Sequence, residues 1–169
     1  MFASLALFTA APAGSAQPSR PLLATEFPAR ALAAHNGART EAGVPPLEWD
    51  NALGTQAAAW AQQMAFTNVF EHSDRKARRG IGENLWFGTH GAFAVESMVG
   101  SWLSEKRMFA PGVFPAVSRT GNWIDVAHSS QVIWPTTTKL GCTLASNGRT
   151  DYLVCRYAPA GNIDGRQVP

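Results

Sequence analysis

The only two cysteines of this 169-residue chain flank a predicted β-hairpin, "CTLASNGRTDYLVC". The Asn147-Gly148 dipeptide favours a tight turn, which brings Cys142 and Cys155 onto nearby rungs of the two strands. A disulfide there closes a loop of 12 intervening residues and stabilises the fold by about 3 kcal/mol of chain entropy. The alternative is a pair of buried free thiols. We favour the disulfide, which fits a protein that folds in an oxidising compartment.

The N-terminal residues 1–16, "MFASLALFTAAPAGSA", contain no charged side chain and end in small residues. This pattern is typical of a secretory signal peptide cleaved before Gln17, and an uncleaved tail is the alternative. A run of about eleven apolar residues is too short to span a bilayer, and no later run is longer. We therefore predict a secreted or periplasmic protein with no transmembrane segment in its mature form.

After a polar lead-in over residues 17–27, residues 28–169 are predicted to form one domain, because their length suits a single core. The net charge is only +2, and charged residues make up 15% of the chain. Basic and aromatic residues do not interleave along any stretch, so we expect no nucleic-acid partner.

Hydrophobic spacing predicts helices over residues 29–42, after the N-cap Asp50, and over residues 95–103. Between the last two, "IGENLWF" is short, aromatic and strand-like. The order of these elements, together with the hairpin, predicts an α+β layered fold.

Four ionisable side chains occupy unusual places: His72, Glu83, Glu105 and His128. Taken singly, each has an ordinary explanation, such as a histidine satisfied by a carbonyl or a solvated glutamate. The chain has no H-E-x-x-H motif, zinc-type cysteine pair, P-loop or G-x-S-x-G motif. Local spacing alone does not bring these four residues together.

Five sequence motifs, in a fixed order along the chain, resemble those of a known family in which the four residues lie together. They are "ALAAHNGARTEAGVPPLEWD", "FEHS", "GIGENLWF", "DVAHSSQVIWPTTTKLGCTLA" and "YLVCRYAPAGN". Over residues 31–162 the chain resembles the CAP superfamily (SCP domain), which comprises cysteine-rich secretory, antigen 5 and pathogenesis-related proteins. Its short length and simple tail resemble the bacterial single-domain members.

The resemblance implies a three-layer α-β-α sandwich, with a small antiparallel sheet between helices. It also implies that His72, Glu83, Glu105 and His128 form the family's cleft tetrad. Two imidazoles there could bind zinc or another divalent cation, with the glutamates beside them. The alternative is a purely structural hydrogen-bonded network.

Other positions of the family pattern carry further expectations. His35, Asn36 and Arg39, in "HNGAR", are interpreted as structural residues that tie the first helix to neighbouring loops. Ser129 and Ser130 stand where the family commonly has tyrosine and threonine, which predicts a wider or wetter groove on that side.

The leading functional hypothesis is a secreted binding module for an apolar ligand such as a lipid, sterol or fatty acid. The loop "MFAPGVFPAV" would offer Phe109 and Phe114 as an exposed contact, and packing of the loop onto the core is the alternative. The second hypothesis is a hydrolase, with Glu83 or Glu105 as general base at a metal, or with Ser73 as nucleophile. A third is a scaffold without a ligand.

The basic segment "DRKARRG", residues 74–80, precedes the Glu83 motif. It could rim the groove and attract anionic ligands, and a solvated loop is the plainer interpretation.

Overall fold

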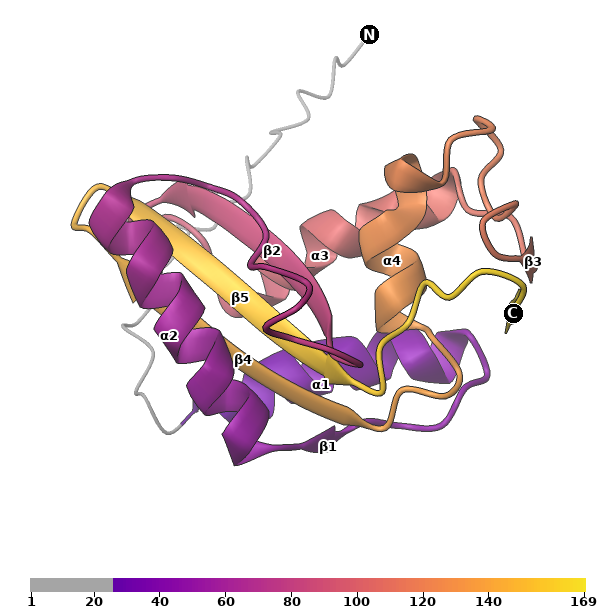
Figure 1. Cartoon of the computed structure of the whole chain (residues 1–169), viewed down its shortest axis with the longest axis horizontal. Coiled ribbons are helices and arrows are strands. Elements are labelled where there is room, and N and C mark those ends of the chain that lie inside the picture. The colour runs from indigo at the N-terminus through magenta and orange to yellow at the C-terminus, as the bar shows by residue number, and fades with distance from the viewer. Residues whose placement is uncertain (1–25) are drawn as a thin grey trace, which may run out of the picture.

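The computed structural model describes residues 26–169, so the predicted signal peptide and nearly all of the lead-in lie outside the described residues. The elements in chain order are α1 (Phe27–Glu41), β1 (Glu48–Trp49), α2 (Asn51–Thr67), β2 (Gly82–Thr89), α3 (Val95–Leu103), the 3₁₀ helix η1 (Ser104–Arg107), β3 (Gly112–Val113), the 3₁₀ helix η2 (Trp123–Val126), α4 (Ala127–Val132), β4 (Lys139–Ser146), β5 (Thr150–Ala158) and β6 (Gln167–Val168). Figure 1 shows their arrangement.

The central sheet has four strands in the order β1-β4-β5-β2. β1 runs parallel to β4, and the remaining pairs are antiparallel. α2 lies along one face of this sheet, whereas α1, α3 and α4 lie on the other side (Figure 1). This layering confirms the predicted α-β-α sandwich.

Side chains of β5 alternate between the two layers, as the two-residue period of a strand requires. Tyr152 and Val154 pack against α2, whereas Leu153, Cys155 and Tyr157 join the core under α1 and α3. The N-cap of α2 is the one predicted, because the Asp50 carboxylate accepts a hydrogen bond from the backbone N–H of Leu53.

The disulfide is confirmed. Cys142 and Cys155 are direct partners in the β4–β5 register, and their sulfur atoms are 2.03 Å apart. Gly148 takes a positive φ of 84° in the turn, a conformation that glycine adopts without steric penalty.

The segment 106–123, which contains "MFAPGVFPAV", does not present the exposed contact that was expected of that stretch. β3 pairs with β6, near the end of the chain, and the side chains of Phe109 and Phe114 are buried with Trp134 and Val168. The expectation that Phe109 and Phe114 form an exposed contact is therefore wrong, because the C-terminal strand adds a small core beneath the loop.

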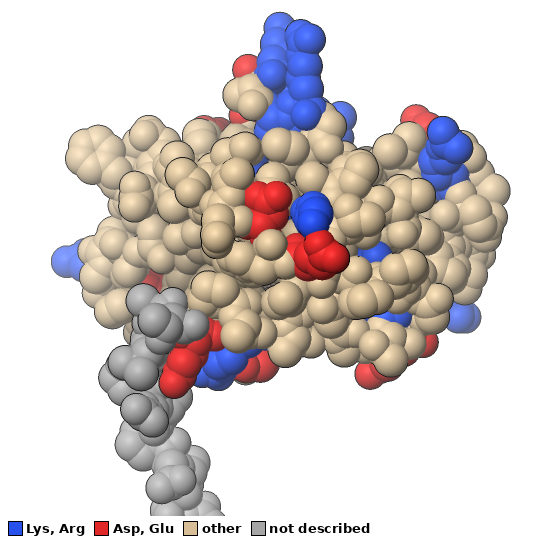
Figure 2. All heavy atoms as spheres, turned by 90° about the horizontal axis from the view of Figure 1, so that it is seen from below, with Lys and Arg blue, Asp and Glu red and all other residues tan. Residues whose placement is uncertain are grey.

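Charged side chains are scattered over the molecule. On the face shown in Figure 2, lysine and arginine lie in separate small groups with acidic side chains beside several of them. Over residues 26–169, every helix falls short of the length and apolar character that crossing a membrane requires.

Candidate functional site

One cavity of about 630 Å³ brings together three of the four tetrad residues. His72 reaches it from the segment between α2 and β2, Glu83 from the start of β2, and His128 from α4. Glu105 lies in η1, behind His128, and is connected to the cavity through that histidine. Segments far apart in sequence thus converge beside the N-terminal end of β2.

The first half of the site is a buried glutamate with an exposed histidine. Nδ1 of His72 lies 2.7 Å from Oε1 of Glu83. The His72 side chain is 53% exposed, while that of Glu83 is fully buried. The backbone N–H and the hydroxyl of Ser73 also donate to this carboxylate, each at 3.0 Å.

Two arginines balance the buried charge of Glu83. Nη2 of Arg156 lies 3.1 Å from Oε2, and Nε of Arg78 lies 3.6 Å from Oε1. Burial opposes ionisation of this carboxyl. The hydrogen bonds from His72 and Ser73, with the charges of Arg156 and Arg78, overcome that opposition and lower its pKa below the ordinary value.

The second half of the site pairs His128 with Glu105. Nδ1 of His128 lies 2.6 Å from Oε1 of Glu105. The other carboxylate oxygen accepts the backbone N–H groups of His128 and Ser129, both at 3.0 Å. The imidazole of His128 stacks on Trp102, with ring centroids 6.0 Å apart and planes inclined by 13°. Glu105 and Trp102 together fix the plane of this ring.

Both histidines are therefore oriented in the same way. A carboxylate oxygen can only accept, so Nδ1 of each imidazole carries the hydrogen. Neither Nε2 makes a hydrogen bond to any residue in the described range 26–169. A carboxylate bound to one nitrogen fixes the tautomer in which the other nitrogen can ligate a metal. Imidazole nitrogens of this kind are ligands that zinc and similar divalent cations accept.

Comparison with known proteins decides the family. The model of the CAP family, described as the cysteine-rich secretory protein family, matches residues 32–157. The chain belongs to the CAP family.

Relatives of this CAP protein come from distant organisms. Pathogenesis-related protein 1C of Nicotiana tabacum is 33% identical over 80% of this chain and 76% of its own. The human Golgi-associated plant pathogenesis-related protein 1 is 32% identical over 82% of this chain and 86% of its own. Scoloptoxin SSD552 of Scolopendra dehaani is 34% identical over 79% of this chain, which spans 63% of the scoloptoxin.

Solved structures share the fold. The crystal structure of NaASP2 with Zn²⁺ superposes with a TM-score of 0.71 at 24% identity, over 86% of this chain and 85% of that one. The structure of BmVAL-1 gives a TM-score of 0.70 at 26% identity, over 89% and 84% of the two chains.

The HNGAR residues of this CAP domain make the structural contacts that were expected. The Arg39 guanidinium donates to the carbonyls of Pro45, Val132, Trp134 and Thr137. Asn36 exchanges two hydrogen bonds with the backbone of Leu47. These contacts join α1 to the segments that lead into β1 and β4.

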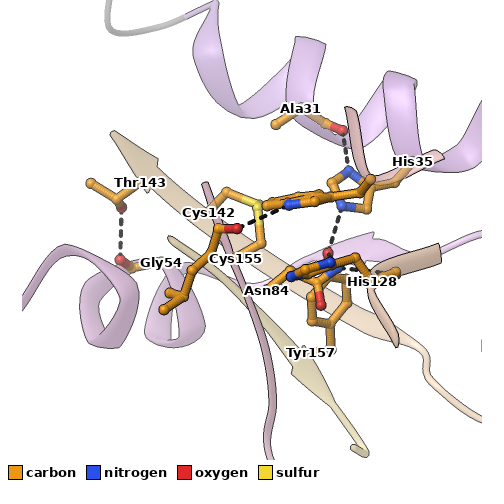
Figure 3. Close-up of a disulfide and its surroundings, with 11 residues drawn as sticks. Ala31, His35, Gly54, Asn84, His128, Cys142, Thr143, Cys155 and Tyr157 are labelled. Carbon is orange, nitrogen blue, oxygen red and sulfur yellow. Dashed lines mark hydrogen bonds between the residues drawn. A yellow bond between two sulfur atoms is a disulfide. The ribbon is translucent and has the colours of Figure 1, made fainter. Parts of the chain in front are cut away.

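His35 belongs to a buried hydrogen-bonded chain that runs from the cavity to α1 (Figure 3). The Asn84 amide donates to the carbonyl of His128 and to the Tyr157 hydroxyl. Nε2 of His35 lies 2.8 Å from that hydroxyl, and its Nδ1 lies 2.7 Å from the carbonyl of Ala31. Because the Ala31 carbonyl only accepts, His35 Nδ1 donates and Nε2 accepts from the hydroxyl.

His35 also lies beside the disulfide, with ligand-type atoms of His35, Cys142 and Cys155 within 4.8 Å of one another. This cluster does not suit a metal. Its two sulfur atoms are joined to each other, and both nitrogens of His35 are already hydrogen bonded. Thiolates and a bare imidazole nitrogen are the ligands that zinc requires.

Ser73 does not meet the geometry of a serine nucleophile. Its hydroxyl donates to Oε2 of Glu83, whereas His72 is bound to the other oxygen of the same carboxylate. A hydroxyl activated by histidine needs a hydrogen bond to the imidazole. The Ser73 hydroxyl therefore serves to stabilise the buried Glu83 carboxylate.

Arg156 is the site residue that sequence reasoning missed. Arg156 follows Tyr152 and Val154 at two-residue spacing, so it lies on the face of β5 that packs against α2, where an apolar side chain is expected. A charged residue at this position of an otherwise apolar strand face was the feature of the sequence that could have indicated it.

Proposed function

We propose that this CAP protein is an exported binding protein whose cavity holds a divalent cation on Nε2 of His72 and Nε2 of His128. Bound zinc would supply a Lewis-acidic site that fixes an anionic or polar group of a ligand. Glu83 and Glu105 serve as the carboxylates that orient the two imidazoles. Export is supported by the disulfide and by relatives such as Secreted protein RBT4 of Candida albicans, 34% identical over 83% of this chain and 37% of its own.

The observation that carries the proposal is the matched orientation of two histidines that line one cavity. Each has Nδ1 bound to a carboxylate, and neither Nε2 has a hydrogen-bond partner within residues 26–169. A structural neighbour, NaASP2, was crystallised with Zn²⁺.

Calorimetric titration with zinc chloride tests the proposal. The wild-type protein should bind one zinc ion, and the double variant His72→Ala, His128→Ala should lose this binding while its melting transition stays nearly unchanged.

The matched control is His90→Ala. His90 is also exposed and bound through Nδ1 to a carboxylate, that of Asp151 at 2.7 Å, but it lies outside the cavity. Its removal should leave zinc binding intact. Unchanged stoichiometry in the double variant, or loss of binding in His90→Ala, contradicts the assignment.

We also propose an apolar ligand, such as a fatty acid or sterol, at a second place. A separate cavity of about 600 Å³ lies between α1 and the segment after α3. Its apolar lining includes Ala34, Ala38, Leu103, Phe109 and Ile133. This cavity supports the apolar-ligand hypothesis after the exposed loop has been ruled out.

Gly37→Leu tests this second proposal, because Gly37 lines the cavity and nothing lies within 4 Å of an added Cβ. Binding of oleate and cholesterol should fall by about tenfold or more, since the side chain occupies the ligand's volume. Gly100→Leu is the control. Gly100 also lies in a helix and has nothing within 4 Å of an added Cβ, but it does not line this cavity. Equal binding by both variants contradicts the proposal.

A further inference from the structure

We infer that a third cavity, between α2 and residues 69–81, binds a small organic anion: a carboxylate or phosphate group attached to an apolar body. This cavity has a volume of about 860 Å³. It adjoins the histidine cavity, and Ser73, Arg78, Arg79 and Ile81 line both. His72 and His128 do not line it, so the inference does not depend on the proposed metal site.

A buried arginine is the central observation. The Arg156 side chain is only 5% exposed and lines the cavity. Its Nη2 faces Glu83, but Nε and Nη1 have no hydrogen-bond partner anywhere in residues 26–169. Buried N–H groups without an acceptor are unfavourable, and those of a charged group especially so. Both nitrogens are closed to solvent in this structure, so an anion entering the cavity would supply acceptors to Arg156 once the lining shifts to uncover them.

The charges around the cavity favour an anion. Lys76, Arg78 and Arg79 line it together with Arg156, and its acidic lining residues are Glu71 and Asp74. The Oδ1 atom of Asp74 already accepts the backbone N–H of Lys76 at 2.8 Å. Arg156 and Arg78 also face the buried Glu83. Four basic groups therefore meet three acidic ones, and the small excess of positive charge comes from the basic segment 74–80.

The lining of the cavity is partly apolar, beside the polar α2 residues Gln56, Gln63 and Thr67. α2 contributes Ala59, Trp60 and Met64, and the facing segment contributes Val69 and Ile81. The indole N–H of Trp60 donates to the carbonyl of Glu71 at 2.9 Å, which ties the two walls together. A ligand with an anionic group and an apolar body matches both the basic and the apolar lining residues, whereas a bare inorganic anion uses only the basic ones.

The experiment follows the Nε–H signal of Arg156 by NMR during titration of the full chain. The probes are phenyl phosphate, phenylacetate, inorganic phosphate and the neutral benzyl alcohol, and an Arg156→Lys sample identifies the signal. We expect one or both aromatic anions to shift the signal saturably, and inorganic phosphate and benzyl alcohol to bind at least about tenfold more weakly. Stronger binding of phenyl phosphate would identify a phosphate site, and stronger binding of phenylacetate a carboxylate site.

Two matched pairs of variants locate the binding. Ala59→Phe fills the cavity from an exposed position on α2, and Ala52→Phe makes the same change outside it. Lys76→Ser removes a charge that lines this cavity, and Arg75→Ser removes one that lines only the histidine cavity. We expect affinity to fall about tenfold in Ala59→Phe and about threefold in Lys76→Ser, with both controls unchanged.

The inference is overturned if no aromatic anion shifts the Arg156 signal, or if benzyl alcohol or inorganic phosphate binds equally well. It is also overturned if Ala59→Phe and Ala52→Phe bind the aromatic anions with equal affinity, or if Lys76→Ser and Arg75→Ser do. Zinc binding by Ala59→Phe should remain intact, so failure of this inference and failure of the metal proposal are distinguishable.

Discussion

His35 shows how one buried residue makes the stability of the whole domain depend on pH. Its imidazole is inaccessible to solvent, and both of its nitrogens are hydrogen bonded in the neutral form. Burial, with a smaller contribution from the charge of Arg39, lowers its pKa from 6.5 to about 4, against the effect of the Ala31 carbonyl.

Protonation of His35 should therefore destabilise the fold in mild acid. Between pH 6.5 and about 4 the unfolded chain binds a proton at His35 that the native protein does not. The free energy of unfolding then falls as the pH falls, by up to about 3 kcal/mol over this window. Urea unfolding at several pH values measures the slope.

His35→Gln removes the titrating group and should flatten this dependence, although it lowers stability at pH 7. The slope is measured for the wild type and for His35→Gln under the same conditions. Equal slopes in wild type and His35→Gln would contradict the assignment.

At the same scale, sequence analysis identified His72, Glu83, Glu105 and His128, but not the groups that stabilise the two carboxylates. Arg156 meets Glu83 because β2 and β5 pair in a register that places them side by side. Glu105 meets the first amides of α4 because η1 packs beside it. The sequence shows Arg156 as a polar residue on an apolar strand face, but it does not show that the partner of Arg156 is Glu83.

The packing of α2 on β4 depends on a close backbone approach. A Cβ at Gly141 would lie 2.2 Å from the backbone nitrogen of Gly54 and 2.7 Å from the carbonyl oxygen of Asp50. Because backbone atoms cannot move aside as a flexible side chain can, the helix must shift to admit a methyl group.

Gly141→Ala should accordingly lower the free energy of unfolding by about 2 to 3 kcal/mol. Gly37→Ala is the contrasting change in α1, where an added Cβ meets nothing within 4 Å. It should raise stability by about 0.5 to 1 kcal/mol through helix propensity. Urea denaturation measures both changes, and a neutral Gly141→Ala would show that α2 does not approach β4 this closely.

Elements with strong local signals were predicted well from sequence. The cap at Asp50, the apolar stripe of α3 and the cysteine-flanked hairpin all lie where they were expected. The segment over residues 106–123 was predicted poorly, because Phe109 and Phe114 are buried by a pairing with β6 near the far end of the chain. Apolar residues in a loop do not show whether another segment covers them.

At the scale of the whole molecule, the fold brings two histidine–glutamate pairs together from four separate segments, and three of the four residues line one cavity. Periodicity and composition predicted a layered α+β domain, but only the CAP resemblance predicted the convergence. The physical reason is that the pairs join residues 11 and 23 positions apart along the chain, beyond the reach of any helical or strand repeat.

The central claim is that His72 and His128 carry hydrogen on Nδ1 and present Nε2 to a shared metal. The most direct measurement is the ¹⁵N spectrum of the histidine rings before and after one equivalent of zinc. We predict that both rings start in the Nδ1–H tautomer and that both Nε2 signals shift together, while His35 and His90 stay unchanged. Nε2–H tautomers at the start, or zinc-induced shifts confined to one of the two rings, would contradict the account.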